Sequence, residues 1–584
     1  MALPSGAAYK YYRALSGLLR TCSSRAHSVG CIYISTLFYR NTCILRHFAH
    51  QLSRSRLYNQ EKMAAPPLLA VAGIVVCLAV LYILRPKRTL PPGPPKLPLI
   101  GNLHQLGKKP MHERCQEWHR QYGPLIYLQL GLDRIAVIGS SQIARDLLDK
   151  RGAQYSSRPR FTMAHDNVTK GFHTATLPYG PRWRLHNRMQ LSVLNKRIVT
   201  RCRKVQEFES LQLIHELLFT NDFHPRFQRW ANSLQTGLGY GQRLAKGDEC
   251  NIHEMEHISR VFRQIFATGT WIVDLFPALN HLPPALAPWK AKADEHFSRT
   301  VELFQLNTEE ALRKTSWNWS KKIRGLTESQ GLPRDEVNFL VGVMAEAGGD
   351  TTGVVLDMFT LAAVHHPEEM ARAQQEIDSV VGPDRLPTFE DVDRLPYVAA
   401  VIKETLRWHP AAPFGLPHSV MQDDTYEGYH IPGGTTIIAS QWSINFDPET
   451  FPNPYEFQPE RYLKNPDLPI SSFGFGRRGC PGRYFAMDSL FISVSRILWA
   501  FRISPIKEGE HDARVPKWNF VADGALLRPE PFQALFSARD GHRQRLIIKE
   551  WAALDKDIDK LYDAIEPVGA DGGSQGKEEI VSAA

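Results

Sequence analysis

The chain has 584 residues, of which 43% are hydrophobic, 22% charged and 10% aromatic, a composition that indicates a folded globular protein and excludes a disordered one. The net charge of +10 does not indicate nucleic-acid binding, because residues 1–62 hold nine Lys or Arg against one acidic residue and carry most of the excess. Eight cysteines with no C-x-x-C pair argue against a zinc site and a disulfide framework.

The first strongly apolar segment is PLLAVAGIVVCLAVLYIL, residues 67–84, which is uncharged and is followed by three basic residues. At about 1.5 Å per residue it just spans a hydrocarbon layer of roughly 30 Å. We therefore predict a transmembrane anchor over 63–85 in preference to a buried core helix. The proline-rich stretch 86–102 that follows is predicted to be a stiff, extended linker.

The N-terminal extension 1–62 conflicts with this anchor. The basic residues that follow the apolar segment favour a cytoplasmic location for the large C-terminal part of the chain, whereas the nine basic residues that precede it favour the opposite orientation. One resolution is that translation starts at Met63, and this is the one we favour. The other is that the extension is an organellar transit segment.

Residues 103–552 are predicted to form one large domain that is mainly α-helical with a smaller β portion. Segment 124–140 alternates and turns as a hairpin does, and 424–440 returns to strand character. Apolar residues three and four positions apart predict helices over 335–365 and 395–409. Residues 553–584 contain eight acidic residues and three lysines and are predicted to be an acidic disordered tail.

The stretch FGFGRRGCPGRYF, residues 473–485, places Cys480 directly before a predicted buried helix. Unpaired N–H groups and the positive end of the helix dipole favour a thiolate there, and a thiolate is a metal ligand. The glycines leave the backbone free to lie against a bulky planar partner. Arg478 is suited to pair with a carboxylate of that partner. The alternative is an inert cysteine in a glycine-rich turn.

The order of Phe473, Gly476, Arg478, Cys480 and Gly482 matches the F-x-x-G-x-R-x-C-x-G haem-binding signature. The chain thus resembles the cytochrome P450 family, from about residue 63 to about residue 550.

This resemblance implies the P450 fold, a haem b cofactor with Cys480 as the axial iron ligand, and a haem-thiolate monooxygenase that uses O2. Electrons would come from NADPH through a separate reductase, which would dock on the basic face near Arg477 and Arg483. The family also implies a single-pass protein of the endoplasmic reticulum membrane with a cytoplasmic catalytic domain. If residues 1–62 are a genuine presequence, the protein is mitochondrial. No nucleic-acid partner is expected.

Three further segments resemble family motifs. Glu404 and Arg407 in KETLR share one helical face, and with Arg461 in PERY they match a buried structural ion network. A surface ion pair is the alternative.

Asp350 and Thr351 in AEAGGDTTG resemble the acid–alcohol pair that delivers protons. We expect the hydroxyl to be released from the carbonyl four residues earlier, so that it holds an ordered water with the carboxylate. Gly348 and Gly349 each cost about 1 kcal/mol inside a helix, and close approach of a flat ligand would explain them. A helix kink with a solvated Asp350 is the alternative.

Trp183 in YGPRWRLHNR matches the tryptophan of a propionate-binding W-x-x-x-R segment, but Asn187 stands where the arginine is expected. Either Arg188 or Arg184 would then substitute, or the contact is lost. His418 in GLPHSV resembles another propionate contact, with an ordinary loop histidine as the alternative.

The substrate is predicted to be a hydrophobic small molecule. The segments that line the pocket in this family fall near 161–178, 341–352, 410–418 and 521–533, and they contain no charge cluster that suggests an ionic substrate. Segment 417–437 resembles fungal monooxygenases of secondary metabolism, which favours a polyketide, indole or terpenoid intermediate. Two other functions stay open: a haem-thiolate isomerase or dehydratase without oxygen insertion, and a degenerate, non-catalytic haem-binding protein.

Overall fold

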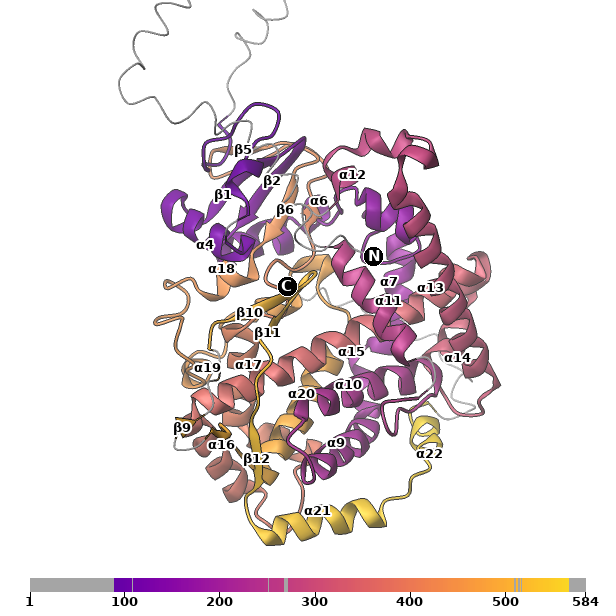
Figure 1. Ribbon diagram of the computed structural model, residues 1–584, viewed down its shortest axis with the longest axis vertical. Coiled ribbons are helices and arrows are strands. Elements are labelled where there is room, and N and C mark those ends of the chain that lie inside the picture. The colour runs from indigo at the N-terminus through magenta and orange to yellow at the C-terminus, as the bar shows by residue number, and fades with distance from the viewer. Residues whose placement is uncertain are drawn as a thin grey trace, which may run out of the picture. The chain divides into compact units, whose positions relative to one another are not determined.

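The computed structural model describes residues 89–107, 109–249, 252–266, 271–508, 511–512, 515 and 517–566. The N-terminal extension 1–62, the predicted anchor 63–85 and residues 567–584 lie outside these ranges. From Leu90 onward the chain forms one unit, drawn in colour in Figure 1.

Helices make up most of this unit. They are α4 (Met111–Tyr122), α5 (Ser141–Ala144), α6 (Gly152–Tyr155), α7 (Pro181–Leu194), α8 (Lys196–Arg201), α9 (Arg203–Leu217), α10 (Phe223–Tyr240), α11 (Ile252–Ile265), α12 (Ile272–Leu275), α13 (Pro288–Arg313), α14 (Trp319–Arg324), α15 (Arg334–His365), α16 (Pro367–Val380), α17 (Pro396–Trp408), α18 (Gln441–Asn445), α19 (Glu460–Lys464), α20 (Arg483–Ala500), α21 (Gly541–Ala553) and α22 (Asp559–Asp563).

Shorter helical turns connect them. Those of 3₁₀ type are Leu103–Gln105, Pro277–His281, Pro284–Leu286, Thr327–Gly331, Phe389–Arg394, Ser471–Phe473 and Gly476–Arg478, and those of π type are Arg145–Lys150 and Thr162–Val168.

The strands are few and short. They are β1 (Leu125–Leu130), β2 (Asp133–Ile138), β3 (His418–Ser419), β4 (Asp424–Tyr426), β5 (Tyr429–Ile431), β6 (Thr436–Ala439), β7 (Phe501–Ser504), β8 (Lys507–Glu508), β9 (His511–Asp512), β10 (Phe520–Asp523), β11 (Leu526–Pro529) and β12 (Leu535–Ala538).

The largest sheet has four strands in the order β1-β2-β6-β3. β1 and β2 form the predicted antiparallel hairpin, in which Leu125 pairs with Ile138 and Leu130 with Asp133. β6 joins β2 in parallel and β3 joins β6 antiparallel, so that the sheet combines chain segments about three hundred residues apart (Figure 1). The other pairs are β4-β5, β7-β12, β8-β9 and β10-β11. The predicted mainly α fold with a smaller β portion is confirmed.

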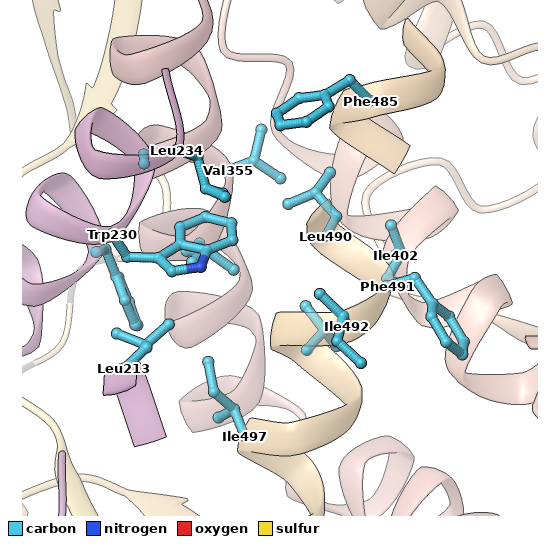
Figure 2. Packing of buried hydrophobic residues seen from close by; sticks show 14 of the residues in the cluster. Leu213, Trp230, Leu234, Val355, Ile402, Phe485, Leu490, Phe491, Ile492 and Ile497 are labelled. Atoms are coloured by element: carbon cyan, nitrogen blue, oxygen red, sulfur yellow. The ribbon is translucent and has the colours of Figure 1, made fainter. Parts of the chain in front are cut away.

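The largest core lies among α9, α10, α15, α17 and α20. Figure 2 shows Trp230 and Leu234 of α10 on the same side as Leu213 of α9, across from Leu490 and Ile497 of α20. These residues are at most 2% exposed. The segment after Cys480 is thereby fixed as a rigid helix, which gives the loop before it a firm base.

Helix α15 runs through this core. Within the described ranges it is the one helix long and apolar enough to cross a membrane, with a mean hydropathy of 1.3, and 72% of its most apolar window is buried inside the unit. Nearly all of its second half is buried against protein, so it is a core helix. The predicted helices over 335–365 and 395–409 are confirmed as α15 and α17.

The prediction of a disordered tail is wrong for residues 553–566. Figure 1 shows the C-terminal helices α21 and α22, in yellow, running along α9. Tyr562 and Ile565 are fully buried and Ile558 is 8% exposed, and Glu566 accepts hydrogen bonds from Trp317 and Lys322. The apolar residues recur at a spacing of four and three, which is a helical pattern. The sequence analysis missed this pattern because it considered only the acidic composition of the whole segment 553–584.

Candidate active site

The loop that carries Cys480 is folded by its own backbone hydrogen bonds. The Cys480 N–H donates to the Phe473 carbonyl over 2.8 Å, and the Gly479 N–H donates to the Gly476 carbonyl over 3.0 Å. Gly482 directly precedes α20, and a Cβ atom there would lie 3.9 Å from the Cys480 sulfur. The sulfur is therefore held just ahead of the first turn of α20, as the sequence predicts.

Gly476 fixes the other side of this loop. Its φ of +60° suits glycine, and a Cβ atom there would lie 2.0 Å from the Leu148 carbonyl oxygen. The Gly476 N–H donates to the Asp149 carboxylate over 2.5 Å. The loop is thus packed tightly against the π-type turn Arg145–Lys150.

Cys480 is exposed, whereas Cys115 and Cys202 are buried. Its pKa is nonetheless raised, because desolvation by the surrounding protein outweighs the hydrogen bond from the Gly482 N–H and the charge of Arg483. The helix start alone therefore does not make Cys480 a thiolate, contrary to the simplest expectation. Coordination to a metal cation deprotonates a thiol outright, and the accessible sulfur is open to one.

Beside the cysteine loop lies a group of basic side chains, of which Arg158 is buried and Arg478 is half-buried. The Arg478 guanidinium stacks over the Trp183 ring, 4.2 Å from its centroid, and donates to the carbonyls of Ser156 and Leu177 over 2.7 and 2.6 Å. The Arg158 guanidinium donates to the carbonyls of Ala175, Leu416 and Pro417 over 2.7–2.9 Å.

Neither arginine forms an ion pair with an acidic side chain of the described residues. Burial lowers the pKa of Arg158 to about 9 and that of Arg478 to about 8, and the charge of Arg158 contributes to the second shift. Burying a charge without a counter-charge costs several kcal/mol. The two guanidinium groups therefore call for an anion that comes from outside the chain.

His418 completes this group. It is 7% exposed and its Nδ1 lies 2.8 Å from the Tyr155 carbonyl oxygen, so Nδ1 carries the proton and Nε2 has a free lone pair. Burial, followed by the charge of Arg158, lowers its pKa to about 3. An incoming carboxylate would raise that pKa and turn Nε2 into a hydrogen-bond donor.

The basic cluster, defined as Arg158, Arg478 and His418 with Trp183 under Arg478, fits the carboxylates of a haem. Desolvated guanidinium groups with no counter-charge suit propionates, and an accessible sulfur on a glycine-rich loop suits a ligated iron. Arg158 was missed by the sequence reasoning. Its segment SSRPRF has no distinctive spacing, and only the tertiary fold brings it to Arg478.

The prediction that Arg188 replaces the arginine missing at Asn187 is wrong. Its side chain is 68% exposed and lies 3.5 Å from Glu328, apart from the basic cluster. Arg184 lies over the Tyr179 ring, 5.7 Å from its centroid. The second positive charge beside Arg478 therefore comes from Arg158 and not from Arg188.

The three residues of the expected ion network meet in the core. Arg407 donates two hydrogen bonds to the Glu404 carboxylate over 2.7 and 2.8 Å, and Arg461 donates one over 3.2 Å. The three side chains are at most 7% exposed. Arg407 also donates to the carbonyls of Asn445 and Pro454. The network ties α17 to the chain that leads into the cysteine loop and is not a surface ion pair.

Asp350 and Thr351 lie in the middle of α15. The Thr351 hydroxyl donates to the Ala347 carbonyl over 2.8 Å, so the expectation that it is released from this carbonyl is wrong. Its oxygen lone pairs stay available as acceptors. Asp350 is paired with Arg263 of α11, and burial raises its pKa.

Gly348 and Gly349 are explained by helix packing and not by a flat ligand. A Cβ atom at Gly348 would lie 2.4 Å from the side chain of Gln235, and one at Gly349 would lie 2.2 Å from the side chain of Asn232. Both of these partners belong to α10. The glycines therefore let α10 pack closely along α15.

The pocket region also contains charges that the sequence reasoning did not expect. Arg263 forms ion pairs with both Asp350 and Asp523, and Arg528 forms ion pairs with the same two carboxylates. This four-residue network joins α11, α15 and the β10-β11 hairpin. Because α11 lies far from the hairpin in sequence, the cluster is invisible in any one segment.

Comparison with known proteins agrees with this geometry. The family model named Cytochrome P450 matches residues 91–536. The chain is 82% identical over 516 residues to cytochrome P450 monooxygenase drtD of Aspergillus calidoustus, covering 88% of this chain and 98% of that protein. It is 44% identical to cytochrome P450 monooxygenase aneD of Aspergillus aculeatus, over 85% of this chain and 96% of that protein. It is 39% identical to cytochrome P450 monooxygenase FrzL of a Cladobotryum species, over 88% and 99%.

The chain belongs to the cytochrome P450 family. It is therefore a haem-dependent monooxygenase that uses O2 and electrons from a reductase partner. The predicted fold, enzyme class and cofactor are confirmed, and neither the isomerase or dehydratase reading nor the degenerate reading is supported.

Proposed function

We propose that Cys480 is the axial ligand of the haem iron and that Arg158, Arg478, Trp183 and His418 hold the haem propionates. The observation that carries this proposal is the pair of guanidinium groups, buried in Arg158 and half-buried in Arg478, without an acidic partner among the described residues. Because these groups lie beside the cysteine loop, one ligand could both pair with the guanidinium groups and bind the Cys480 sulfur. Phe473, Gly476 and Gly482 act by shaping the loop around the sulfur.

When bound, haem with a thiolate ligand supplies the activation of O2 that inserts one oxygen atom into a C–H or C=C bond. The chain's own task is to manage protons. Asp350 exchanges protons, and Thr351 accepts a hydrogen bond with the lone pairs that its bond to Ala347 leaves free. The Glu404, Arg407 and Arg461 network holds the structure around the cysteine loop.

The substrate that we propose is a hydrophobic intermediate of fungal secondary metabolism, of polyketide, indole or terpenoid type. Its support is the similarity to monooxygenases from Aspergillus and Cladobotryum and the aromatic residues of the pocket segments, such as Phe172 packed against Phe297 and Phe339. Mass spectrometry of reconstituted enzyme with candidate intermediates should find a product heavier by one oxygen atom.

We further propose that the protein is anchored in the endoplasmic reticulum membrane by one helix, with the catalytic domain in the cytoplasm. Support comes from exposed apolar side chains near the start of the described chain, in the β1-β2 turn, at the start of α12 and in the 3₁₀ turn Pro284–Leu286: Leu97, Leu99, Ile100, Leu132, Ile272 and Leu286, which are 42–84% exposed. Exposed apolar side chains suit a membrane surface. The full chain should stay in the membrane pellet after alkaline carbonate washing, and release into the supernatant would contradict the anchor.

Electrons are proposed to come from an NADPH-dependent reductase that docks beside Cys480. Arg477 and Arg483 are exposed next to the cysteine, which supports contact with an acidic partner surface. Reversing the charge of Arg483 should raise the reductase concentration needed for half-maximal turnover, and unchanged kinetics would remove this face from the interface.

The reduced carbon monoxide difference spectrum tests the assignment of the site. The wild-type protein should show the strongly red-shifted band of a thiolate-ligated haem. Cys480→Ala should lose that band, whereas Cys202→Ala, which changes a buried cysteine elsewhere, should keep it. A thiolate band that survives in Cys480→Ala would overturn the proposal.

A further inference from the structure

Glu346 is an acid on α15 that the family motifs do not use. It stands one helical turn before Asp350, so both side chains project from the same side of the helix. The residue is partly accessible to water, but its Oε1 atom is buried, and burial is the largest cause of its raised pKa. The carboxyl group is therefore largely shielded from solvent.

The charged groups around Glu346 come from four elements. Asp350 is on its own helix, Arg263 is on α11, and the phenol of Tyr240 on α10 also interacts with it. Behind Asp350 stand Asp523 and Arg528 of the β10-β11 hairpin. These groups include three carboxyls, Glu346, Asp350 and Asp523, but only two guanidinium groups. The cluster is neutral when one of the three carboxyls holds a proton.

Ion pairing decides which carboxyl holds that proton. Asp350 and Asp523 are each paired with Arg263 and Arg528, whereas Glu346 forms no ion pair in the described part of the chain. Its Oε1 atom is buried and has no hydrogen-bond partner there, and the same is true of the Tyr240 hydroxyl. Burial and then the charge of Asp350 raise the pKa of Glu346 to about 8, although Arg263 opposes the shift. At neutral pH the proton therefore resides on Glu346.

We propose that Glu346 is the proton reserve of Asp350: Asp350 rests as the carboxylate held by Arg263 and Arg528, and during turnover the carboxylic acid of Glu346 supplies the proton that Asp350 then passes on. The Glu346 O–H bond breaks, its proton passes through a water molecule, and a new O–H bond forms on an oxygen of Asp350. No electron is transferred, and solvent later returns a proton to Glu346. The role rests on the proposed proton delivery by Asp350. Glu346 acts through Asp350 and is a positioning residue in this sense, not a catalytic one.

Infrared difference spectroscopy of the resting holoenzyme tests the proton directly. Wild-type enzyme should show the C=O band of a protonated carboxyl group that disappears with a midpoint at about pH 8. Glu346→Gln should lack this band, and Asp335→Asn, the same chemical change near the N-terminal end of α15, should keep it. A wild-type enzyme without the band at neutral pH, or a band that persists in Glu346→Gln, would overturn the proposal.

Thermal stability gives a second readout that does not need activity. The pKa of Glu346 is raised on folding, from 4.5 to about 8, so the folded state binds more protons than the unfolded state between these values. Wild-type stability therefore falls as pH rises through this window. Glu346→Gln cannot titrate and lacks this pH dependence. The Tm of the variant minus the Tm of the wild type should therefore increase as pH rises. Parallel Tm profiles would contradict the raised pKa.

Turnover then separates this role from substrate binding. Glu346→Gln should lower kcat by about tenfold, a modest share of what proton transfer contributes, leave KM unchanged and release more hydrogen peroxide per NADPH. A raised KM with unchanged kcat would make Glu346 a substrate contact and overturn the proposal. If Asp350→Asn lowers kcat and Glu346→Gln does not, the proposed role of Glu346 is wrong but that of Asp350 stands. If neither is impaired, the proposed role of Asp350 fails as well.

Discussion

Arg158 lies in a segment without a recognisable motif, yet the fold buries it beside Arg478. Three backbone carbonyls hold its guanidinium in place, and burial lowers its pKa to about 9. Such a position is costly unless an anion compensates the charge. Arg158 and Arg478 are therefore preorganised for an anionic ligand, and binding of that ligand should stabilise the whole region.

At the residue scale we predict that Arg158→Leu weakens haem retention. Losing a charge-assisted hydrogen bond costs about 1.5–3 kcal/mol, which corresponds to at least a tenfold faster transfer of haem to apomyoglobin. The measurement is the transfer rate, together with the ratio of haem to protein absorbance. Arg188→Leu is the matched control, because Arg188 is exposed and paired with Glu328, and it should behave as wild type. Equal transfer rates for the two variants would remove Arg158 from the haem site.

Helix α15 needs glycine at the positions where α10 packs closely against it. Gly348 and Gly349 weaken the helix locally but allow α10 to approach it so closely that added Cβ atoms would meet Gln235 and Asn232. The same helix carries Asp350 and Thr351. The contact between α10 and α15 therefore sets the depth at which the acid–alcohol pair sits relative to the core.

At the element scale we predict that Gly348→Ala destabilises the protein by about 1–3 kcal/mol through overpacking, although alanine is the better helix former by about 1 kcal/mol. Adding Gln235→Ala should restore most of this loss, since it removes the side chain that the new Cβ would meet. Urea unfolding midpoints of the two single variants and the double variant give the coupling energy. Additive effects would show that the two positions do not interact.

At the scale of the whole molecule, the C-terminal segment is part of the folded unit. α22 inserts Tyr562 against Gly237 of α10, where a Cβ atom would lie 2.1 Å from the Tyr562 hydroxyl. Lys322 and Trp317 bind Glu566 from the other side. The segment thus joins α9, α10 and α14, which are separated from it by more than two hundred residues of chain.

For this segment we predict that Tyr562→Ala lowers stability by about 3–5 kcal/mol, the range for removing a large buried aromatic side chain. Tyr562→Phe is the matched control. The Tyr562 hydroxyl is buried without a hydrogen-bond partner among the described residues, so removing it should be neutral or stabilising. Thermal unfolding of full-length proteins measures both. A Tyr562→Ala variant with the wild-type Tm would show that α22 does not support the fold.

Motifs that are contiguous in the chain could be predicted well. The Cys480 loop depends on glycines, hydrogen bonds and a helix start within ten residues, and the helices α15 and α17 depend on local apolar spacing, so each leaves a readable pattern. Arg188 was the wrong choice because the W-x-x-x-R pattern cannot show which distant arginine supplies the missing charge. The hydrogen bond from the Thr351 hydroxyl to Ala347 was not predicted, because a sequence motif does not specify the side-chain rotamer.

The family, the mainly helical fold and the cysteine proposed to ligate the haem could be inferred from the sequence alone, because these depend on residues close together in the chain or on a signature with fixed spacing. Only the tertiary structure decided that Arg158 joins Arg478, that α22 belongs to the core and that Glu346 shares a charge cluster with Asp350. The physical reason is that burial and electrostatic neighbours depend on distances in space. These distances are set by the packing of helices that lie far apart in the sequence.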